Sequence, residues 1–345
     1  MALDNVSPVS PNAGFVGGSS GQDLLLATWA GEVLNAYDRY NVFEGLVTSR
    51  SIESGRSIEF PVTGRVGVVE AWEAGVALEG GGAPTGKFSI ELDDRPVAAH
   101  FELDNIEQLV SQFEYRSEMA RQCGQALART RDTQLGHLIV KAAGTAARQL
   151  DESGIDTSYA GQVVTDADTA DADAEVRALA FLKAIEGELV RRQEIDVDTA
   201  GLNLIVNPAD FHAIRRLGVA DSASDIASGQ MPMFGNQFFG TEGNPNMLAG
   251  LTIRDSLTYM GCKISSTNNL PTSDRSSTGD SNYQVDASNT TGLLFSPDAV
   301  ASVKKMDLAM DTFRDVRRNT EFVVAQMFCG AGVLRPELAV QVKSA

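Results

Sequence analysis

Residues 50–65 read RSIESGRSIEFPVTGR, and within them Ile58, Phe60 and Val62 alternate with polar or charged neighbours. A period of two is typical of a strand that buries one face. Residues 87–92, KFSIEL, alternate in the same way and are placed to return as an antiparallel partner. Together the two segments predict a two-stranded ribbon with one apolar face.

The predicted ribbon continues beyond these strands and has a glycine-rich tip. Residues 97–103, VAAHFEL, keep the alternation, so we expect the excursion to occupy residues 56–103 and to enclose residues 75–86. An isolated two-stranded hairpin is only marginally stable in water. Something outside the ribbon must therefore cover its apolar face.

The tip contains GGGAPTGKF at residues 80–88, which nearly matches the phosphate-binding pattern GxxxxGK[ST]. That pattern needs a Ser or Thr hydroxyl after the Lys to hold magnesium, and a helix after the loop. Phe88 stands in place of the hydroxyl, and a strand pattern follows Lys87. The stretch therefore predicts a flexible turn between strands and not a nucleotide-binding loop.

Helical periodicity flanks the ribbon on both sides. Residues 1–22 are rich in Ser, Pro, Gly and Asn and predict an extended arm, which an amphipathic helix over residues 25–37 follows. After the ribbon, Asp104 suits an N-cap for a long helix that reaches about Gln149. Three glycines weaken this helix at intervals: Gly124, Gly136 and Gly144.

The second half of the chain predicts a separate α/β lobe. A helix over residues 174–193 precedes a buried strand over residues 202–207 and a short helix that carries Phe211, Ile214 and Leu217. Long loops follow at residues 218–250 and 271–289, and such loops are usually functional or mobile. Strands are then expected at residues 292–295, within residues 299–328, and at Val340 and Val342.

Composition restricts the class of function. The chain has 345 residues, enough for about two domains, and its formal net charge of −18 argues against tight binding to DNA phosphates. The sequence has no apolar run of membrane-spanning length and no basic start of a signal peptide, which predicts a cytoplasm-like compartment. Cys123, Cys262 and Cys329 lack paired spacing and predict small buried thiols.

The candidate catalytic and metal-binding residues lack the spacing or the local structure that such sites require. His100, His137 and His212 share no HxxxH arrangement, and the GGSSG at residues 17–21 lacks the strand that a nucleophile elbow needs. Residues 166–173, DADTADAD, lack the Gly and closing Glu of a calcium loop and are better explained as caps of the next helix. We expect no catalytic residue, cofactor or metal, and keep as an alternative an acidic cytoplasmic hydrolase that binds metal at residues 166–173.

Four strings, in order, resemble the major capsid proteins of short-tailed double-stranded DNA bacteriophages. They are residues 50–65, YRSE at 115–118, VNPADF at 206–211 and GVLRPE at 332–337. The resemblance implies the α+β fold shared by tailed-phage and herpesvirus capsids, in five parts. These are an N-terminal arm and short helix (1–49), an extended two-stranded loop (50–103), a peripheral domain with a long spine helix (104–195), an axial α/β domain (196–298) and return strands of the peripheral domain (299–345).

The resemblance also implies a self-assembling structural protein and not an enzyme. Hexamers and pentamers of the chain would form an icosahedral shell in the host cytoplasm, with scaffolding and portal proteins as further partners and double-stranded DNA enclosed without tight binding. The expected inter-subunit contacts lie on the extended loop: Arg50, Arg56, Ile58, Phe60, Val62, Arg65, Trp72 and Lys87. The charged members are expected to pair with acidic neighbours. A non-shell phage protein, such as a tail or decoration component, is a further alternative.

Overall fold

The computed structural model describes residues 32–33, 35–37, 40–64, 75, 85–104, 115–148, 150–151, 154–155, 157–217, 257–277, 279–315 and 317–345. The predicted arm at residues 1–22, the start of the helix predicted at 25–37, most of the glycine-rich tip and the loop at 218–250 lie outside these residues. Among the helices that the structure describes, none is both long enough and apolar enough to cross a membrane.

The chain forms two compact units, each assembled from segments that are distant in sequence. Unit 1 comprises residues 1–41, 92–131 and 304–329, and unit 2 comprises residues 42–91, 132–303 and 330–345. Three long elements run from one unit into the other: α3 (Tyr115–Ala143), β12 (Val300–Asp315) and β13 (Thr320–Val333).

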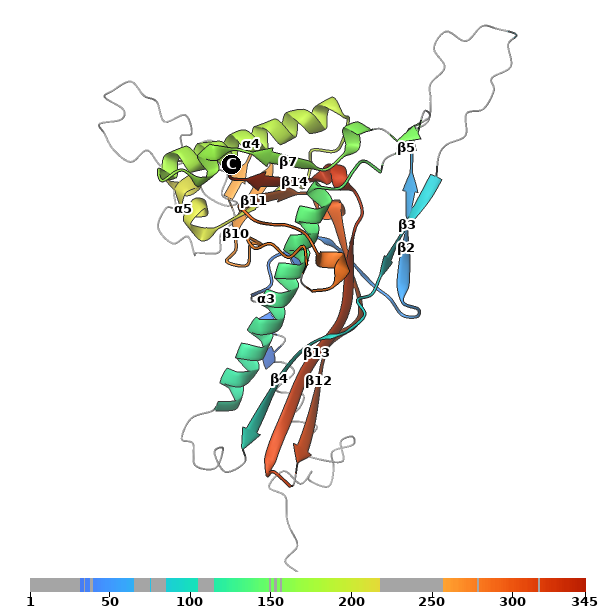
Figure 1. Ribbon diagram of the computed structural model, residues 1–345, viewed down its shortest axis with the longest axis vertical. Helices are drawn as coiled ribbons and strands as arrows, with labels where there is room; N and C mark the ends of the chain where they lie inside the picture. Colours follow the sequence, from blue (N-terminus) through green and yellow to red (C-terminus); the bar gives the residue numbers. More distant parts are fainter. Residues whose placement is uncertain are drawn as a thin grey trace, which may run out of the picture. The chain divides into compact units, whose positions relative to one another are not determined.

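Unit 2 contains a six-stranded sheet with the order β7-β14-β11-β8-β10-β9 (Figure 1). Strand β11 is antiparallel to β8 and β14, whereas β10 is parallel to β8 and β7 is parallel to β14. All four residues of β8 are buried, as expected for a strand inside a covered sheet. The strands are β7 (Gln162–Thr165), β8 (Asn203–Val206), β9 (Leu257–Tyr259), β10 (Cys262–Ser266), β11 (Thr290–Phe295) and β14 (Ala339–Lys343).

Helices α4 (Ala174–Glu194) and α5 (Pro208–Leu217) pack on one face of this sheet. The Asp173 carboxylate caps α4 by accepting a hydrogen bond from the backbone N–H of Glu175. The apolar residues of α4, among them Phe181 and Ile185, pack with Leu204 of β8 and with other residues of this face. The helices predicted over 174–193 and around 211–217, and the strand predicted over 202–207, are therefore confirmed.

The opposite face of the sheet packs on the second half of α3. Leu135, Leu138 and Ile139 share a core with Leu293 and Phe295 of β11. Helix α3 ends at Ala143, so the predicted end near Gln149 was wrong. The last turn tightens at Thr145, whose N–H bonds to the Ala142 carbonyl three residues back and whose hydroxyl donates to the Lys141 carbonyl.

Asp132 of α3 is a buried carboxylate that holds the segment before the one-turn helix η1 (Glu44–Leu46). It accepts hydrogen bonds from the backbone N–H groups of Val42 and Phe43, at 3.1 Å each, and from the Asn269 amide at 3.0 Å. Burial raises the pKa of Asp132 to about 6, although these hydrogen bonds favour its charged form. The carboxylate therefore ties two distant segments to α3.

The four-stranded sheet has the order β1-β12-β13-β4, where β1 is Thr48–Ser51 and β4 is Val97–Asp104. Strand β4 pairs antiparallel with β13, from Thr320 opposite Asp104 to Met327 opposite Val97. The prediction that residues 97–103 continue the ribbon was therefore wrong. The ribbon ends at Glu91, and the N–H of Asp93 then bonds to the Cys329 carbonyl, which directs the chain along β13.

The first half of α3 packs on β13 in unit 1. Leu127 and Ala128 of the helix share a core with Val323, Ala325 and Met327 of the strand, together with Val33 and Tyr37 from the short N-terminal helix.

Cys123, Cys262 and Cys329 are all buried and unbridged, as predicted. The predicted return strands at 292–295, 299–328 and 340–342 are also confirmed.

Gly161 lies against the end of α3, where no side chain fits. A Cβ at this position would meet the carbonyl oxygen of Ala142 and lie 2.6 Å from that of Ala143, and these backbone atoms cannot move aside. We expect Gly161→Ala to lower the free energy of unfolding by about 2–3 kcal/mol through overpacking. Urea denaturation of the soluble subunit measures this, with Gly187→Ala as the control because nothing lies within 4 Å of a Cβ at Gly187. Equal midpoints for the two variants would contradict the assignment.

Candidate assembly interface

The predicted ribbon is present as strands β2 (Ser57–Thr63) and β3 (Thr85–Glu91), which lie side by side in Figure 1. They pair antiparallel, with Ile58 opposite Ile90 and Phe60 opposite Phe88. Because alternate residues of a strand point to opposite faces, these four side chains share one face of the ribbon.

The two faces of the ribbon differ in chemistry. Ile58, Phe60 and Val62 form the apolar face with Phe88 and Ile90. Ser, Thr, Glu, Pro and Lys side chains form the other face, where the Lys87 ammonium lies 2.5 Å from the Glu59 carboxylate and both side chains are exposed. Such an exposed pair contributes little stability and mainly keeps the polar face soluble.

The body of unit 2 covers part of the apolar face. Ile90 is 4% exposed and Phe60 is 6% exposed. A Cβ at Gly332 would lie 2.8 Å from Cγ1 of Ile90, so the glycine lets β13 approach the ribbon closely. Ile58, Val62 and Phe88 remain partly exposed. The body thus covers Phe60 and Ile90 but leaves the rest of the apolar face incompletely covered.

Two arginines stack on the aromatic rings of the ribbon. The guanidinium carbon of Arg50, on β1, lies 4.6 Å from the centre of the Phe60 ring, and that of Arg148 lies 5.0 Å from the centre of the Phe88 ring. Arg148 also donates a hydrogen bond of 2.9 Å to the Val333 carbonyl. Cation–π contacts of this kind attach the ribbon to the body of the unit.

A cavity of about 380 Å³ opens between the ribbon and the body. Its apolar wall comes from the ribbon, mainly Phe60, Val62 and Phe88, and from Leu334. Its polar wall contains three arginines and two carboxylates: Arg50, Arg148, Arg335, Asp298 and Glu337. The five charged residues come from four separate segments of the chain.

Some charges of the cavity are already satisfied within the chain. Arg335 lies 2.7 Å from the Glu337 carboxylate, and the Thr48 hydroxyl donates to Asp298 at 2.8 Å. Burial lowers the pKa of Arg148, while the charge of Glu337 acts in the opposite direction. Arg148 is therefore a partly desolvated cation at the wall of the cavity.

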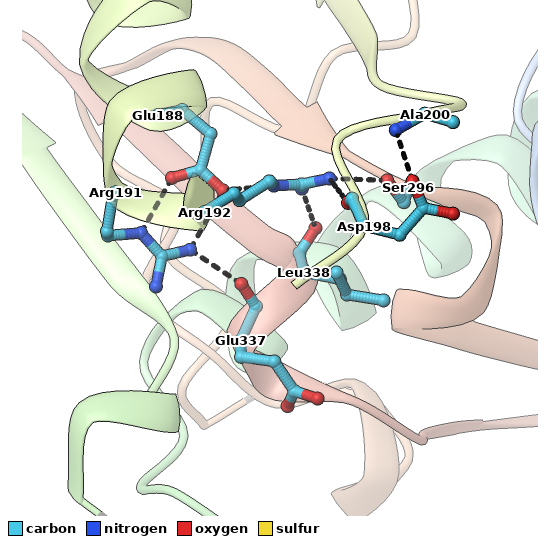
Figure 2. A network of polar contacts seen from close by, with 8 residues as sticks. All are labelled: Glu188, Arg191, Arg192, Asp198, Ala200, Ser296, Glu337 and Leu338. Atoms are coloured by element: carbon cyan, nitrogen blue, oxygen red, sulfur yellow. Dashed lines mark hydrogen bonds and ion pairs between the residues drawn. The ribbon is translucent and has the colours of Figure 1, made fainter. Parts of the chain in front are cut away.

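Glu337 is fixed by a buried network on α4 (Figure 2). Glu188 accepts from Arg191 at 2.8 Å and from Arg192 at 2.6 Å, and Arg191 also donates to the Glu337 carbonyl. Arg192 is fully buried and donates further to the Ser296 hydroxyl and the Leu338 carbonyl. The network connects α4 to Ser296 and to the segment that contains Glu337 and Leu338.

The predicted contact residues have different surroundings in the structure. Arg50 and Phe60 meet each other, Lys87 pairs with Glu59, and Ile58 and Val62 are partly exposed on the ribbon. Arg56 is exposed just before β2. Arg65 and Trp72 lie outside the described residues. No sequence signal indicated Arg148, Asp298 or Glu337, because only the fold brings them to the ribbon.

Residues 166–173 serve as caps, as the simpler interpretation predicted. The Asp166, Asp171 and Asp173 carboxylates accept hydrogen bonds from the backbone N–H groups of Asp168, Asp173 and Glu175 respectively. Among the described residues, no group of three or more His, Cys, Asp or Glu side chains is arranged to hold a metal ion. Residues 166–173, the site that the hydrolase alternative requires, therefore act as caps in the part of the chain that the structure describes.

Comparison with known proteins identifies the family. The sequence profile described as "Gp10A-like: Major capsid protein" matches residues 85–343, three quarters of the chain. The chain belongs to the Gp10A-like major capsid protein family. The major capsid protein of Escherichia phage T7 is 25% identical over 338 residues, which covers 92% of this chain and 90% of the relative. The T7 minor capsid protein is also 25% identical, with 78% of its length covered.

Solved structures support the Gp10A-like family assignment. The capsid structure of cyanophage P-SCSP1u has a TM-score of 0.66 and 25% identity, with 99% of each chain covered. The mature capsid of bacteriophage PhiM1 has a TM-score of 0.64 at 18% identity, which supports the fold. The resemblance to phage major capsid proteins and the predicted α+β tailed-phage capsid fold are both confirmed, and the protein is a phage major capsid protein.

Proposed function

We propose that this capsid protein acts as a non-enzymatic subunit that assembles as hexamers and pentamers into an icosahedral shell around double-stranded DNA. The supporting observation is the similarity over 99% of the chain to the capsid structure of cyanophage P-SCSP1u. The incompletely covered ribbon agrees with this role, because an apolar face that one copy leaves open is available to another. Head-to-tail contacts of this kind close into rings when the rotation between copies permits.

In this proposal the ribbon supplies contacts between subunits. The residues proposed to meet the neighbouring copy are Arg50, Arg56, Ile58, Phe60, Val62, Arg65, Trp72 and Lys87. Arg50 also stacks on Phe60 within its own chain. The arginines and Lys87 guide the register of assembly more than they add affinity, because rim charges act mainly on specificity and association rate. The five-part division inferred from sequence forms part of the same proposal, with one change: the extended loop ends at Glu91, because β4 pairs with β13.

Scaffolding and portal proteins are proposed as assembly partners, and the host cytoplasm as the place of assembly. A tail or decoration protein is less well supported than a shell subunit, because the matching family is described as a major capsid protein. The metal-dependent hydrolase is less well supported, because no metal-binding group is found among the described residues and the matching family is described as a major capsid protein.

Enclosed DNA is expected to bind only weakly to the subunit. The net charge of −18 opposes approach of phosphates, since affinity for DNA depends on Lys and Arg that displace counterions. Fluorescence anisotropy with a labelled duplex at physiological salt should give a dissociation constant weaker than about 1 μM. A nanomolar constant would contradict this prediction.

Size-exclusion chromatography with light scattering tests the proposed function. The purified protein should elute with particles of megadalton mass, in exchange with a pool of free subunits. A single species of one chain at every concentration would refute shell assembly.

A further inference from the structure

We infer that the cavity between the ribbon and the body of unit 2 receives a carboxylate-bearing segment of a second copy of this chain. The inference rests on the proposed self-assembly and adds the site and the chemistry of one contact. The cavity is defined above by Arg50, Arg148, Arg335, Asp298 and Glu337 with the ribbon aromatics.

Two guanidinium groups of the cavity are available to a carboxylate. Among the described residues, Arg335 pairs with Glu337, whereas Arg50 and Arg148 form no ion pair. Each of these two stacks a face on a phenylalanine ring, which leaves the N–H groups at the edge of the guanidinium plane. Arg148 uses one nitrogen on the Val333 carbonyl and keeps further donors. A planar fork of N–H donors suits a carboxylate.

The charge of the cavity favours an acidic occupant. Three arginines against two carboxylates leave its wall with one net positive charge, whereas the whole chain carries −18. A desolvated cation such as Arg148 is costly, and an opposite charge at hydrogen-bond distance offsets that cost. An incoming Asp or Glu therefore gains more here than at an ordinary exposed arginine.

The position of the cavity favours a second copy as the source. The cavity lies under the ribbon, beside Val62 and Phe88, which the body leaves partly exposed. Its volume of about 380 Å³ is near the lower limit of ligand pockets, enough for a few side chains of an inserted segment. An acidic chain that assembles with itself brings many carboxylates to such a site.

Cross-linking with isotope labels tests the source of the carboxylate. Arg148→Lys and Arg50→Lys each place a primary amine at the cavity, and carbodiimide then joins an amine to a touching carboxylate as an amide, the carbodiimide taking up the water. Particles are assembled from equal amounts of ¹⁴N and ¹⁵N subunits. We expect tryptic cross-links from position 148 or 50 in which one peptide is light and the other heavy. Cross-links within single-isotope pairs only, for example to Asp298 or Glu337, or none at all, would overturn the inference.

An assembly titration provides the second test. Arg50→Ala combined with Arg148→Ala should raise by at least tenfold the subunit concentration at which half the protein is in particles. Lys183→Ala, an exposed cation on α4 outside the cavity, should leave that concentration unchanged. If the unaltered protein forms no particles, the proposed function fails. If it assembles and the arginine variant matches the Lys183 control, only the cavity inference fails.

Discussion

Deletion of Ala71–Lys87 is expected to leave a folded, soluble subunit that forms no closed particles. The cut removes the distal ribbon and keeps the pairs Ile58–Ile90 and Phe60–Phe88, which anchor the base to the body. The cores of both units consist of other residues, so the subunit should keep its circular dichroism spectrum and thermal transition. Without the projecting part, neighbouring copies lose the contact that we propose holds them in register.

Glu59→Gln is the matched control for this deletion. It removes the ion pair with Lys87 but keeps the length and the strand pairing of the ribbon, and an exposed pair contributes little. Negative-stain micrographs should show particles for the control and none for the deletion. Normal particles from the deletion variant would remove the ribbon from the assembly mechanism.

The second prediction is a large loss of folding stability when Glu188 in unit 2 is replaced. Replacing Glu188 with Gln should lower the free energy of unfolding by about 3–5 kcal/mol, because it leaves the fully buried Arg192 without its carboxylate partner. Arg191 loses the same partner but is 17% exposed, so water compensates part of its loss. Urea denaturation of the soluble subunit measures the change.

Two further variants separate charge burial from simple loss of a contact. Glu118→Gln breaks a comparable pair with Arg121 on the surface of α3, where both side chains are nearly half exposed, and should leave the midpoint unchanged. Glu188→Leu combined with Arg192→Met should recover much of the lost stability, because apolar replacement of a buried ion pair is often neutral. A Glu188→Gln midpoint equal to that of Glu118→Gln would show that the network is not stabilising.

Local patterns in the sequence predicted where the helices and strands lie better than they predicted which strands pair with each other. The alternation at Ile58, Phe60 and Val62 identified a strand with one apolar face, and the same alternation at residues 97–103 identified another. Alternation tells which face of a strand is buried but not which strand lies beside it, so β4 was assigned to the ribbon although it pairs with β13. Helix α4 was predicted closely because its cap and its apolar stripe are both local.

The cavity was beyond the reach of sequence reasoning for a different reason. Arg50, Arg148, Asp298 and Arg335 are separated by tens to hundreds of residues and follow no spacing rule. Of these, only Arg50 was expected to make contacts, because it belongs to the ribbon segment. Acidic residues 166–173 were read correctly as caps, since hydrogen bonds to nearby N–H groups depend only on neighbours along the chain.

Electron cryomicroscopy of the purified protein at high concentration tests self-assembly most directly. We predict closed icosahedral particles built from hexamers and pentamers, in which density for the ribbon of each copy contacts the adjacent copy. Compact single subunits under all conditions, with the ribbon folded onto the body of its own chain, would contradict the proposal.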